Sequence, residues 1–218
     1  MAVATVIAVA AVGLLLLAPE DPVRSLPAPT TAAPRTRAAA PAAPSTPKAP
    51  AQRPVLVAAP TRVEVPSVDL AVDVVPVTPA GDALDPPTLT EAYWIQTYGT
   101  PGTDADNTVY LAGHSFDRGQ AAFNPLFDKD AQVPVVQPGA EIVVTTAAGR
   151  LTYAVESTQR YPKGGLPDVD EVWRIVPGRL VLITCFQRND GGASRDNLVV
   201  YAHLVGSAPT AGATASAP

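Results

Sequence analysis

The chain has 218 residues, among them 25 prolines, and a formal net charge of −5 at pH 7. This length holds one domain of ordinary size together with low-complexity flanks. The acidic balance, without a dominant basic stripe, excludes a nucleic-acid-binding protein, because such proteins gather lysine and arginine on one surface. We therefore expect one folded core and no nucleic-acid partner.

The first segment, residues 1–18, is apolar and is predicted to enter a membrane. No charged side chain occurs between Ala2 and Ala18, and about 17 residues at about 1.5 Å each lie at the short end of what crosses a bilayer. A cleaved signal peptide is the alternative, but Leu16 occupies a position before the most evident cleavage site where a small residue is required. We favour an uncleaved single-pass anchor in the cell membrane, with the folded domain extracellular. Arginines follow this segment and none precedes it, which by the positive-inside rule weakly favours the opposite orientation.

Two further segments lack the pattern of a folded chain. Residues 19–60 are mostly Pro, Ala and Thr with scattered Arg, a composition that cannot bury enough apolar surface to fold. Their prolines favour extended conformations that reach up to about 130 Å, so we expect a disordered linker that acts as a spacer. An inert linker would have the same structure. Residues 206–218 are small and polar and are predicted to form a disordered tail.

Residues 61–205 predict an all-β domain. Short runs rich in β-branched residues alternate with turn residues, and we expect strands at 62–65, 72–77, 108–114, 141–146, 151–156, 180–185 and 197–205. Short strands at this frequency are typical of a closed barrel or a sandwich. Only two segments, 88–93 and 120–127, are predicted to be helical.

The single cysteine, Cys185, stands at the end of the apolar run 180–185. One cysteine cannot form an internal disulfide, and an exposed thiol outside the cell is a liability unless it reacts for a purpose. This favours a catalytic thiol. The alternative is a buried cysteine that packs as a small hydrophobe.

Of the two histidines, His114 is the candidate partner of the thiol. It follows the apolar run 109–112 and Gly113, so we expect its ring at the end of a strand, where loops build functional sites. A thiol needs a base or a cationic neighbour to become an effective nucleophile, and histidine supplies either. His203 falls inside the last predicted strand and is interpreted as structural or as a surface residue.

Acyl transfer also needs donors for the oxyanion that develops on the attacked carbonyl group, and a fixed guanidinium can supply them. Arg188 and Arg195 compete for this role. Arg188 belongs to a polar loop, where a solvated charge is the simplest expectation. Arg195 directly precedes the strand predicted at 197–205, which would hold it in place, and we favour Arg195.

Three separated motifs now agree in order and context: Leu-Ala-Gly-His114-Ser, Leu-Val-Leu-Ile-Thr-Cys185 and Arg195-Asp-Asn-Leu-Val-Val-Tyr-Ala. In these motifs the chain resembles the sortases, the cysteine transpeptidases of Gram-positive cell surfaces. The resemblance covers nearly all of residues 61–205, and Gly99-Thr-Pro-Gly is similar to the class F and class E branches of actinobacteria. The resemblance implies a sortase-like eight-stranded β-barrel with one or two short helices.

The resemblance also implies a reaction. Cys185 would attack the Thr–Gly bond of a Leu-Pro-x-Thr-Gly-type sorting signal, and an amine of a peptidoglycan precursor would resolve the thioacyl enzyme. His114 would pass protons to and from the amines, Arg195 would hold substrate and oxyanion, and Thr184 would be a further substrate contact. The expected partners are surface proteins with C-terminal sorting signals, the peptidoglycan amine, and the membrane through residues 1–18.

No cofactor or metal is expected. The acidic residues Asp168, Asp170 and Glu171 are interpreted as a solvated turn, not as the calcium site of some sortases. Residues 19–60 lack an Asp-Pro-Trp lid motif, which makes a pilin-polymerising role less favoured.

Two other functions stay open from the sequence. An L,D-transpeptidase places a His-Gly-Cys cluster a few residues before an arginine, whereas no histidine approaches Cys185 in this sequence. A non-catalytic wall-binding β domain on a membrane stalk would need its cysteine and histidine only for structure. A Cys185 that resists alkylation in the folded protein would favour that second alternative.

Overall fold

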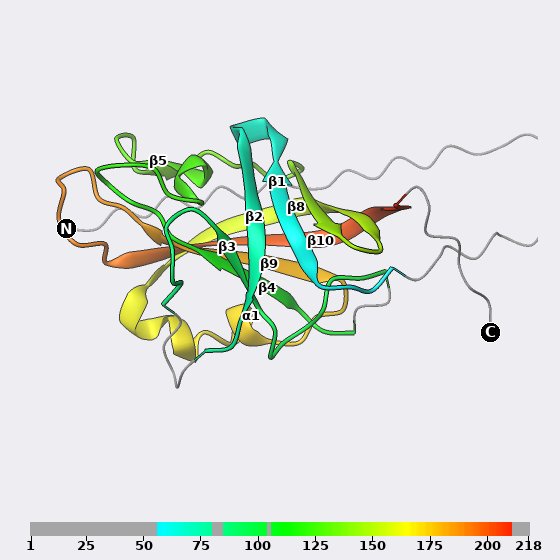
Figure 1. The fold of residues 1–218 in the computed structure, drawn as a ribbon. Helices are drawn as coiled ribbons and strands as arrows, with labels where there is room; N and C mark the ends of the chain where they lie inside the picture. Colours follow the sequence, from blue (N-terminus) through cyan, green and yellow to red (C-terminus); the bar gives the residue numbers. More distant parts are fainter. Residues whose placement is uncertain (1–55, 80–84, 104–105, 211–218) are drawn as a thin grey trace, which may run out of the picture. The chain divides into compact units, whose positions relative to one another are not determined.

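The computed structural model describes residues 56–79, 85–103 and 106–210. These residues form a closed β-barrel with the strand order β1-β2-β3-β4-β9-β10-β8-β7 (Figure 1). The barrel strands are β1 (Pro60–Val65), β2 (Leu70–Val77), β3 (Ala92–Ile95), β4 (Val109–Gly113), β7 (Glu141–Thr146), β8 (Gly149–Pro162), β9 (Arg179–Phe186) and β10 (Asp196–Pro209). The prediction of an all-β barrel is confirmed.

The remaining elements are short. A two-stranded ribbon is formed by β5 (Phe127–Asp128) and β6 (Val133–Pro134). Four helical turns complete the described part: η1 (Pro66–Val68), η2 (Asn124–Leu126), η3 (Lys163–Asp168) and α1 (Asp170–Trp173). Both η3 and α1 belong to the connection between β8 and β9.

The strand β9 lies between β4 and β10, and its two neighbours run in different directions. β4 pairs with β9 in parallel, from Val109 opposite Leu180 to Ala112 opposite Ile183. β10 pairs with β9 antiparallel and brings Asn197 opposite Cys185. The carboxyl end of β4, the carboxyl end of β9 and the start of β10 therefore meet at one end of the barrel.

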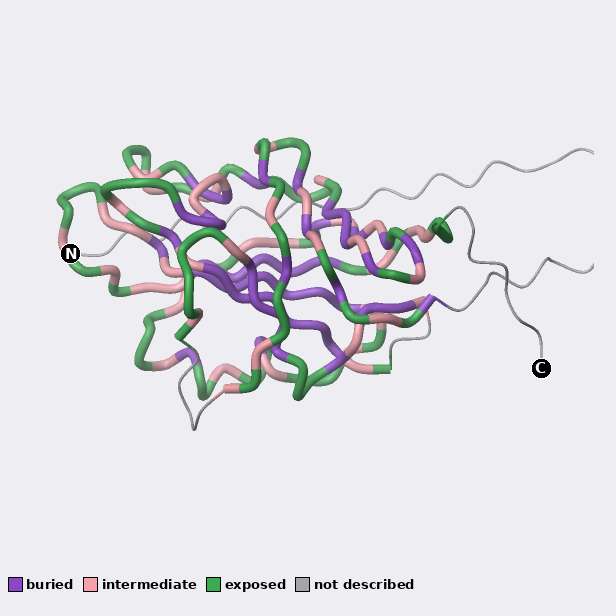
Figure 2. The backbone as a smooth tube through the Cα atoms, in the orientation of Figure 1, coloured by how far each residue is buried: buried purple, intermediate pink, exposed green. Residues whose placement is uncertain are grey.

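The side chains of β9 are buried on both of its faces. Leu180, Leu182 and Phe186 belong to the barrel core, whereas Val181 and Ile183 belong to a second cluster with residues of η3 and α1. Figure 2 shows buried residues along the central strands and exposed residues in the loops. A strand that is covered on both faces reads as a continuous apolar run, which is why it is readily found in the sequence.

Both helical predictions need correction. The segment predicted to be a helix at 88–93 leads into strand β3, whose four residues are all buried and pair with β2 and β4. Its burial on both faces removes the alternation that would have indicated a strand. The helix predicted at 120–127 is only the single turn η2, which contains a proline in its first positions, and Phe127 returns to an extended conformation (φ −151°, ψ 153°).

Two predicted boundaries of the domain also shift. Leu56 is 4% exposed within the core and Val57 pairs with Gly102, so the folded part begins inside the linker predicted at 19–60. β10 extends to Pro209 and pairs there with Gly149, so the tail predicted at 206–218 begins too early. The predicted anchor at 1–18 and most of the predicted linker lie outside the described residues. Within the described ranges, no helix is long and apolar enough to cross a bilayer.

Candidate active site

Cys185 and His114 line one cavity of about 460 Å³ at the end of the barrel where β4 and β9 finish. Each of the two strands places one of these residues at its carboxyl end. The β4–β9 ladder ends with Ala112 opposite Ile183, and His114 and Cys185 each follow two residues later. Residues two apart share a face of a strand, so both side chains project from the same face as Ala112 and Ile183. We call the ends of β4 and β9, with His114 and Cys185, the floor of the site.

The opposite side of the cavity is formed by the β8–β9 connection, residues 163–178, which we call the wall. Lys163, Leu166, Pro167 and Trp173 of the wall line the cavity. Apolar side chains predominate on it, and the cavity also receives the charged side chains of Asp85 and Lys163. A cavity with apolar sides and a few convergent polar groups is the usual form of a binding site for a small molecule or peptide side chain.

Cys185 is partly exposed, whereas its neighbours Thr184 and Phe186 are buried. The side chain is accessible at the cavity and is not packed as a small hydrophobe inside the barrel. This placement argues against the purely structural interpretation of the thiol.

The ring of His114 is held by the segment that precedes β3. Its Nε2 lies 2.8 Å from the carbonyl oxygen of Pro86 and 3.9 Å from Oδ1 of Asp85. A carbonyl oxygen can only accept, so Nε2 carries the hydrogen and donates it. In the neutral ring the lone pair is then on Nδ1, which is the nitrogen that can accept a proton.

Side-chain hydrogen bonds continue the connection between the two strands beyond their ladder. The Ser115 hydroxyl, next to His114, donates to the carbonyl oxygen of Cys185. Nε2 of Gln187 donates to the carbonyl oxygen of Ser115 at 2.8 Å and contacts its Oγ at 3.0 Å. Gln132 in turn donates from Nε2 to the carbonyl oxygen of Gln187 at 3.0 Å. The backbone segments that carry His114 and Cys185 are thus bonded to each other directly.

Arg195 lies outside the cavity that Cys185 and His114 line. It borders an adjacent pocket together with Arg160, Arg188 and Asp190. Arg195 is exposed. Its charge contributes to the lowered pKa of Asp190, but among the described residues its guanidinium makes no hydrogen bond or ion pair. Its role as oxyanion donor stays a prediction.

The competing residue, Arg188, is engaged by Asp190. Nε of Arg188 donates to Oδ1 of Asp190 at 2.8 Å, and Nη2 donates to the other carboxylate oxygen. Hydrogen bonding from Arg188, followed by the backbone N–H of Gly192, holds the pKa of Asp190 well below its usual range. Of the two arginines, Arg195 is therefore the one whose donors are available to a substrate.

Thr184 and His203 lie in contrasting surroundings. Thr184 also borders the cavity; it is 3% exposed, and its buried Oγ1 has no hydrogen-bond partner within the described part of the chain. His203 is exposed and its Nδ1 lies 3.1 Å from Oε1 of Glu156. This position on the surface agrees with the prediction made for His203.

Several cavity residues were not found from the sequence. Asn197 faces Cys185 across the β9–β10 ladder, and pairing the predicted strands 180–185 and 197–205 as a hairpin could have identified it. Asp85 and Pro86 belong to an irregular segment and Trp173 to the four-residue helix α1, and in neither is there enough hydrophobic periodicity to give a signal.

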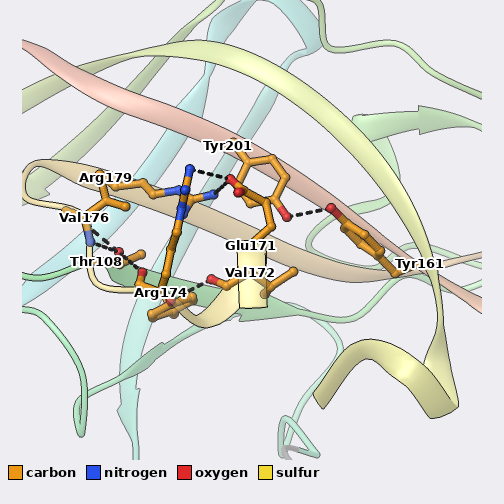
Figure 3. A network of polar contacts seen from close by, with 9 residues as sticks. Thr108, Tyr161, Glu171, Val172, Arg174, Val176, Arg179 and Tyr201 are labelled. Carbon is orange, nitrogen blue, oxygen red and sulfur yellow. Dashed lines mark hydrogen bonds and ion pairs between the residues drawn. The ribbon is translucent and has the colours of Figure 1, made fainter. Parts of the chain in front are cut away.

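Glu171, one of the three acidic residues of the wall, is bonded to two arginines. Glu171 Oε1 accepts from Nη2 of Arg174 at 3.0 Å and from Nη2 of Arg179 at 2.8 Å (Figure 3). No group of three or more His, Cys, Asp or Glu side chains within the described ranges could hold a metal ion.

A closed β-barrel that presents a cysteine and a histidine at the ends of adjacent parallel strands defines a class of cysteine-dependent enzymes. The family model of the sortase domain matches residues 63–205, and the chain belongs to the sortase family, the cysteine transpeptidases. The chain is similar to sortase A from Corynebacterium diphtheriae (22% identity, 74% of this chain and 65% of that chain covered, TM-score 0.50). It is also similar to sortase C-1 from Actinomyces oris (24% identity, 66% and 73% covered, TM-score 0.49) and to a variant of sortase E from Streptomyces avermitilis (21% identity, 73% and 95% covered, TM-score 0.48). Among curated proteins no sequence matches the chain.

Proposed function

We propose that this transpeptidase cleaves a Leu-Pro-x-Thr-Gly-type sorting signal between Thr and Gly and transfers the acyl part to an amine of the cell wall. The observation that carries the proposal is that His114, directly after β4, and Cys185, near the end of the paired strand β9, line one cavity. The three sequence motifs that contain Cys185, His114 and Arg195 support the choice of substrate.

In the first half of the reaction, the thiolate of Cys185 attacks the carbonyl carbon of the substrate threonine. A C–S bond forms, and the carbonyl oxygen becomes an oxyanion, which Arg195 stabilises if its free guanidinium reaches over from the adjacent pocket. The C–N bond then breaks. The glycine amine leaves with a proton from His114, and a thioester on Cys185 remains.

In the second half, the incoming amine attacks the thioester and gives a proton to His114. The C–S bond breaks and an amide bond forms, so that the thiolate and the imidazolium are regenerated. Thr184 is proposed as a further substrate contact, because it directly precedes Cys185 and borders the cavity.

The proposed partners follow from the same reaction. They are surface proteins with C-terminal sorting signals and an amine of a peptidoglycan precursor. The apolar segment 1–18 and the Pro-rich segment 19–60 support an anchor in the cell membrane with a spacer, which would present the barrel outside the cell.

Mass spectrometry of the full chain tests the proposal. The protein is incubated with a Leu-Pro-Ala-Thr-Gly peptide, with and without triglycine, and a parallel sample is treated with iodoacetamide. We expect an acyl adduct on Cys185 that turns over to a triglycine-linked product. A thiol that alkylates readily but forms no adduct or product would contradict the proposed sorting signal or the proposed amine acceptor. A thiol that neither alkylates nor reacts would favour a non-catalytic wall-binding domain.

A further inference from the structure

The wall of the cavity cannot hold its own position. Its only regular elements are the turn η3 and the four-residue helix α1, and isolated helices shorter than about 12–15 residues are marginal in water. Nevertheless Leu166, Pro167 and Trp173 of this segment border the cavity. The position of these side chains must therefore come from contacts between the wall and the barrel.

Arg179, the first residue of β9, makes one of these contacts from a buried position. Its side chain is 4% exposed, and its Nη2 lies 2.8 Å from Oε1 of Glu171 in α1. The guanidinium lies over the ring of Tyr201, 4.4 Å from the ring centroid (Figure 3). Its Nη1 is buried without a hydrogen-bond partner in the described part of the chain.

The charge of Arg179 consequently depends on Glu171. Burial, followed by the hydrogen bond to Tyr161, raises the pKa of Tyr201 above its usual value, so this ring stays neutral and supplies no counter-charge. A buried guanidinium without an anionic partner is strongly unfavourable. Among the ion pairs of the described residues, Glu171–Arg179 is the one that joins α1 to a barrel strand.

Neutral hydrogen bonds hold the backbone of the same segment. Tyr110 of β4 donates from Oη to the carbonyl oxygen of Val172 at 2.7 Å, and Nε1 of Trp173 donates to the carbonyl oxygen of Leu166 at 2.8 Å. The second bond joins α1 to η3, so a shift of α1 is transmitted to both cavity-lining parts of the wall. The floor is bonded separately, through the β4–β9 ladder and Ser115.

We propose that Arg179 and Glu171 are positioning residues that set the affinity for the substrate by fixing the wall against the barrel. This inference rests on the proposed function, and it concerns recognition and not the chemical step. Neither residue lines the cavity; they act through Trp173 and Leu166.

The chain provides a matched control on the same oxygen atom. Arg174 also donates to Oε1 of Glu171, at 3.0 Å, but its side chain is 59% exposed and it belongs to the wall itself. Exposed ion pairs of this kind contribute little. Removal of Arg174 should thus leave the wall in place, whereas neutralisation of Glu171 should release it.

The experiment uses the full chain with Glu171→Gln, Arg174→Gln and the double variant Glu171→Gln/Arg179→Met. With a sorting-signal peptide, we expect KM to rise about tenfold in Glu171→Gln while kcat and the rate of Cys185 alkylation stay within about twofold. Arg174→Gln should change neither constant by more than about twofold. The double variant should recover part of the loss, because the buried charge is gone together with its partner.

A second measurement does not depend on peptide cleavage. In a Trp94→Phe background, acrylamide quenching of Trp173 should increase in Glu171→Gln and not in Arg174→Gln. Equal effects of Glu171→Gln and Arg174→Gln, or a fall in kcat with an unchanged KM in Glu171→Gln, would overturn the proposal.

If the starting protein cleaves no peptide, the proposed function fails, and the quenching comparison alone decides whether Glu171 and Arg179 fix the wall. If Glu171→Gln does not fold, the double variant Glu171→Gln/Arg179→Met replaces it in both measurements. The proposal is then contradicted if the double variant has the same KM and the same quenching of Trp173 as Arg174→Gln.

Discussion

The floor and the wall of the cavity are held by different kinds of interaction. The floor is the end of a buried parallel strand pair, where ladder hydrogen bonds and core side chains fix the backbone. The wall is a connection of short helical turns that individual side chains bond to the barrel: Tyr110 bonds its backbone at Val172, and Arg179 bonds the side chain of Glu171. In the proposed reaction, chemistry belongs to the floor and recognition belongs largely to the wall. Substitutions in the two regions should therefore separate kcat from KM.

The largest effect is expected at the floor itself. Cys185→Ala should abolish peptide cleavage, a loss of more than about 10⁴-fold, because the proposed nucleophile is gone. The side chain is only partly buried, so the thermal midpoint should change by less than about 3 °C. A peptide-cleavage assay and a thermal melt measure both quantities, and retained cleavage would dismiss the assignment of the nucleophile.

The next largest effect distinguishes the two arginines near the floor. Arg195→Lys should lower kcat/KM by about 100-fold, because a lysine cannot reproduce the planar fork of donors. Arg188→Lys is the matched control and should cost less than about threefold, since Arg188 is bonded to Asp190. Steady-state kinetics with one peptide compares the two. If Arg188→Lys proved the damaging change, the roles assigned to the two residues would have to be exchanged.

A smaller effect is expected from the side chains that bond the two halves of the floor. Ser115→Ala removes the hydroxyl that donates to the Cys185 carbonyl, and it should lower kcat about tenfold with little change in KM. Ser115→Thr keeps the hydroxyl and should restore most of the rate. Gln137→Ala, which removes an exposed glutamine bonded to the carbonyl oxygen of Val135, is the control for a loop side chain remote from the cavity. A rise in KM at constant kcat in Ser115→Ala would instead show that Ser115 contributes to substrate binding, as proposed for the wall, and not to the chemical step.

The smallest effect is expected in the barrel core behind the floor. Tyr153 is 1% exposed and its buried hydroxyl has no partner in the described part of the chain; burial raises the pKa of this phenol, so it stays neutral. Tyr153→Phe removes an unsatisfied polar group and should change the free energy of unfolding by no more than about 1 kcal/mol, in the stabilising direction. Denaturant unfolding measures it, with kcat and KM unchanged. A clear loss of stability would indicate a hydrogen bond that the structure does not contain.

The two regions also differ in how far the sequence predicts them. The strands of the floor were predictable, because they are apolar runs that end in a cysteine and in Gly113-His114, and functional residues gather at such strand ends. The parallel pairing of β4 with β9, which brings the two ends together, is a long-range contact that the local pattern does not indicate. Asn197 could be derived from the same strands by hairpin register. Strand β3 was not predicted, because its residues show no alternation of apolar and polar side chains; all four are buried: Ala92, Tyr93, Trp94 and Ile95.

The wall was not predictable from local pattern. Its residues form turns that are stabilised by partners far away in sequence, such as Tyr110 with Val172. Glu171 was interpreted as part of a solvated turn, and its partner Arg179 was not considered, because nothing in the sequence indicates that an arginine at the start of an apolar strand is buried. The boundaries failed for a related reason: Leu56 is buried by contacts with the distant barrel, although its surroundings in sequence are those of a linker.

The contact between Nε2 of His114 and the Pro86 carbonyl oxygen bears on proton transfer in the proposed reaction. Nε2–H can keep this bond whether the ring is neutral or charged, since it is the donor in both states. One nitrogen, Nδ1, would then release the proton to the departing amine and collect it from the arriving one. The imidazole ring would then need no flip between the two halves of the proposed reaction. The departing amine and the arriving amine would have to occupy the same place beside Nδ1, one after the other.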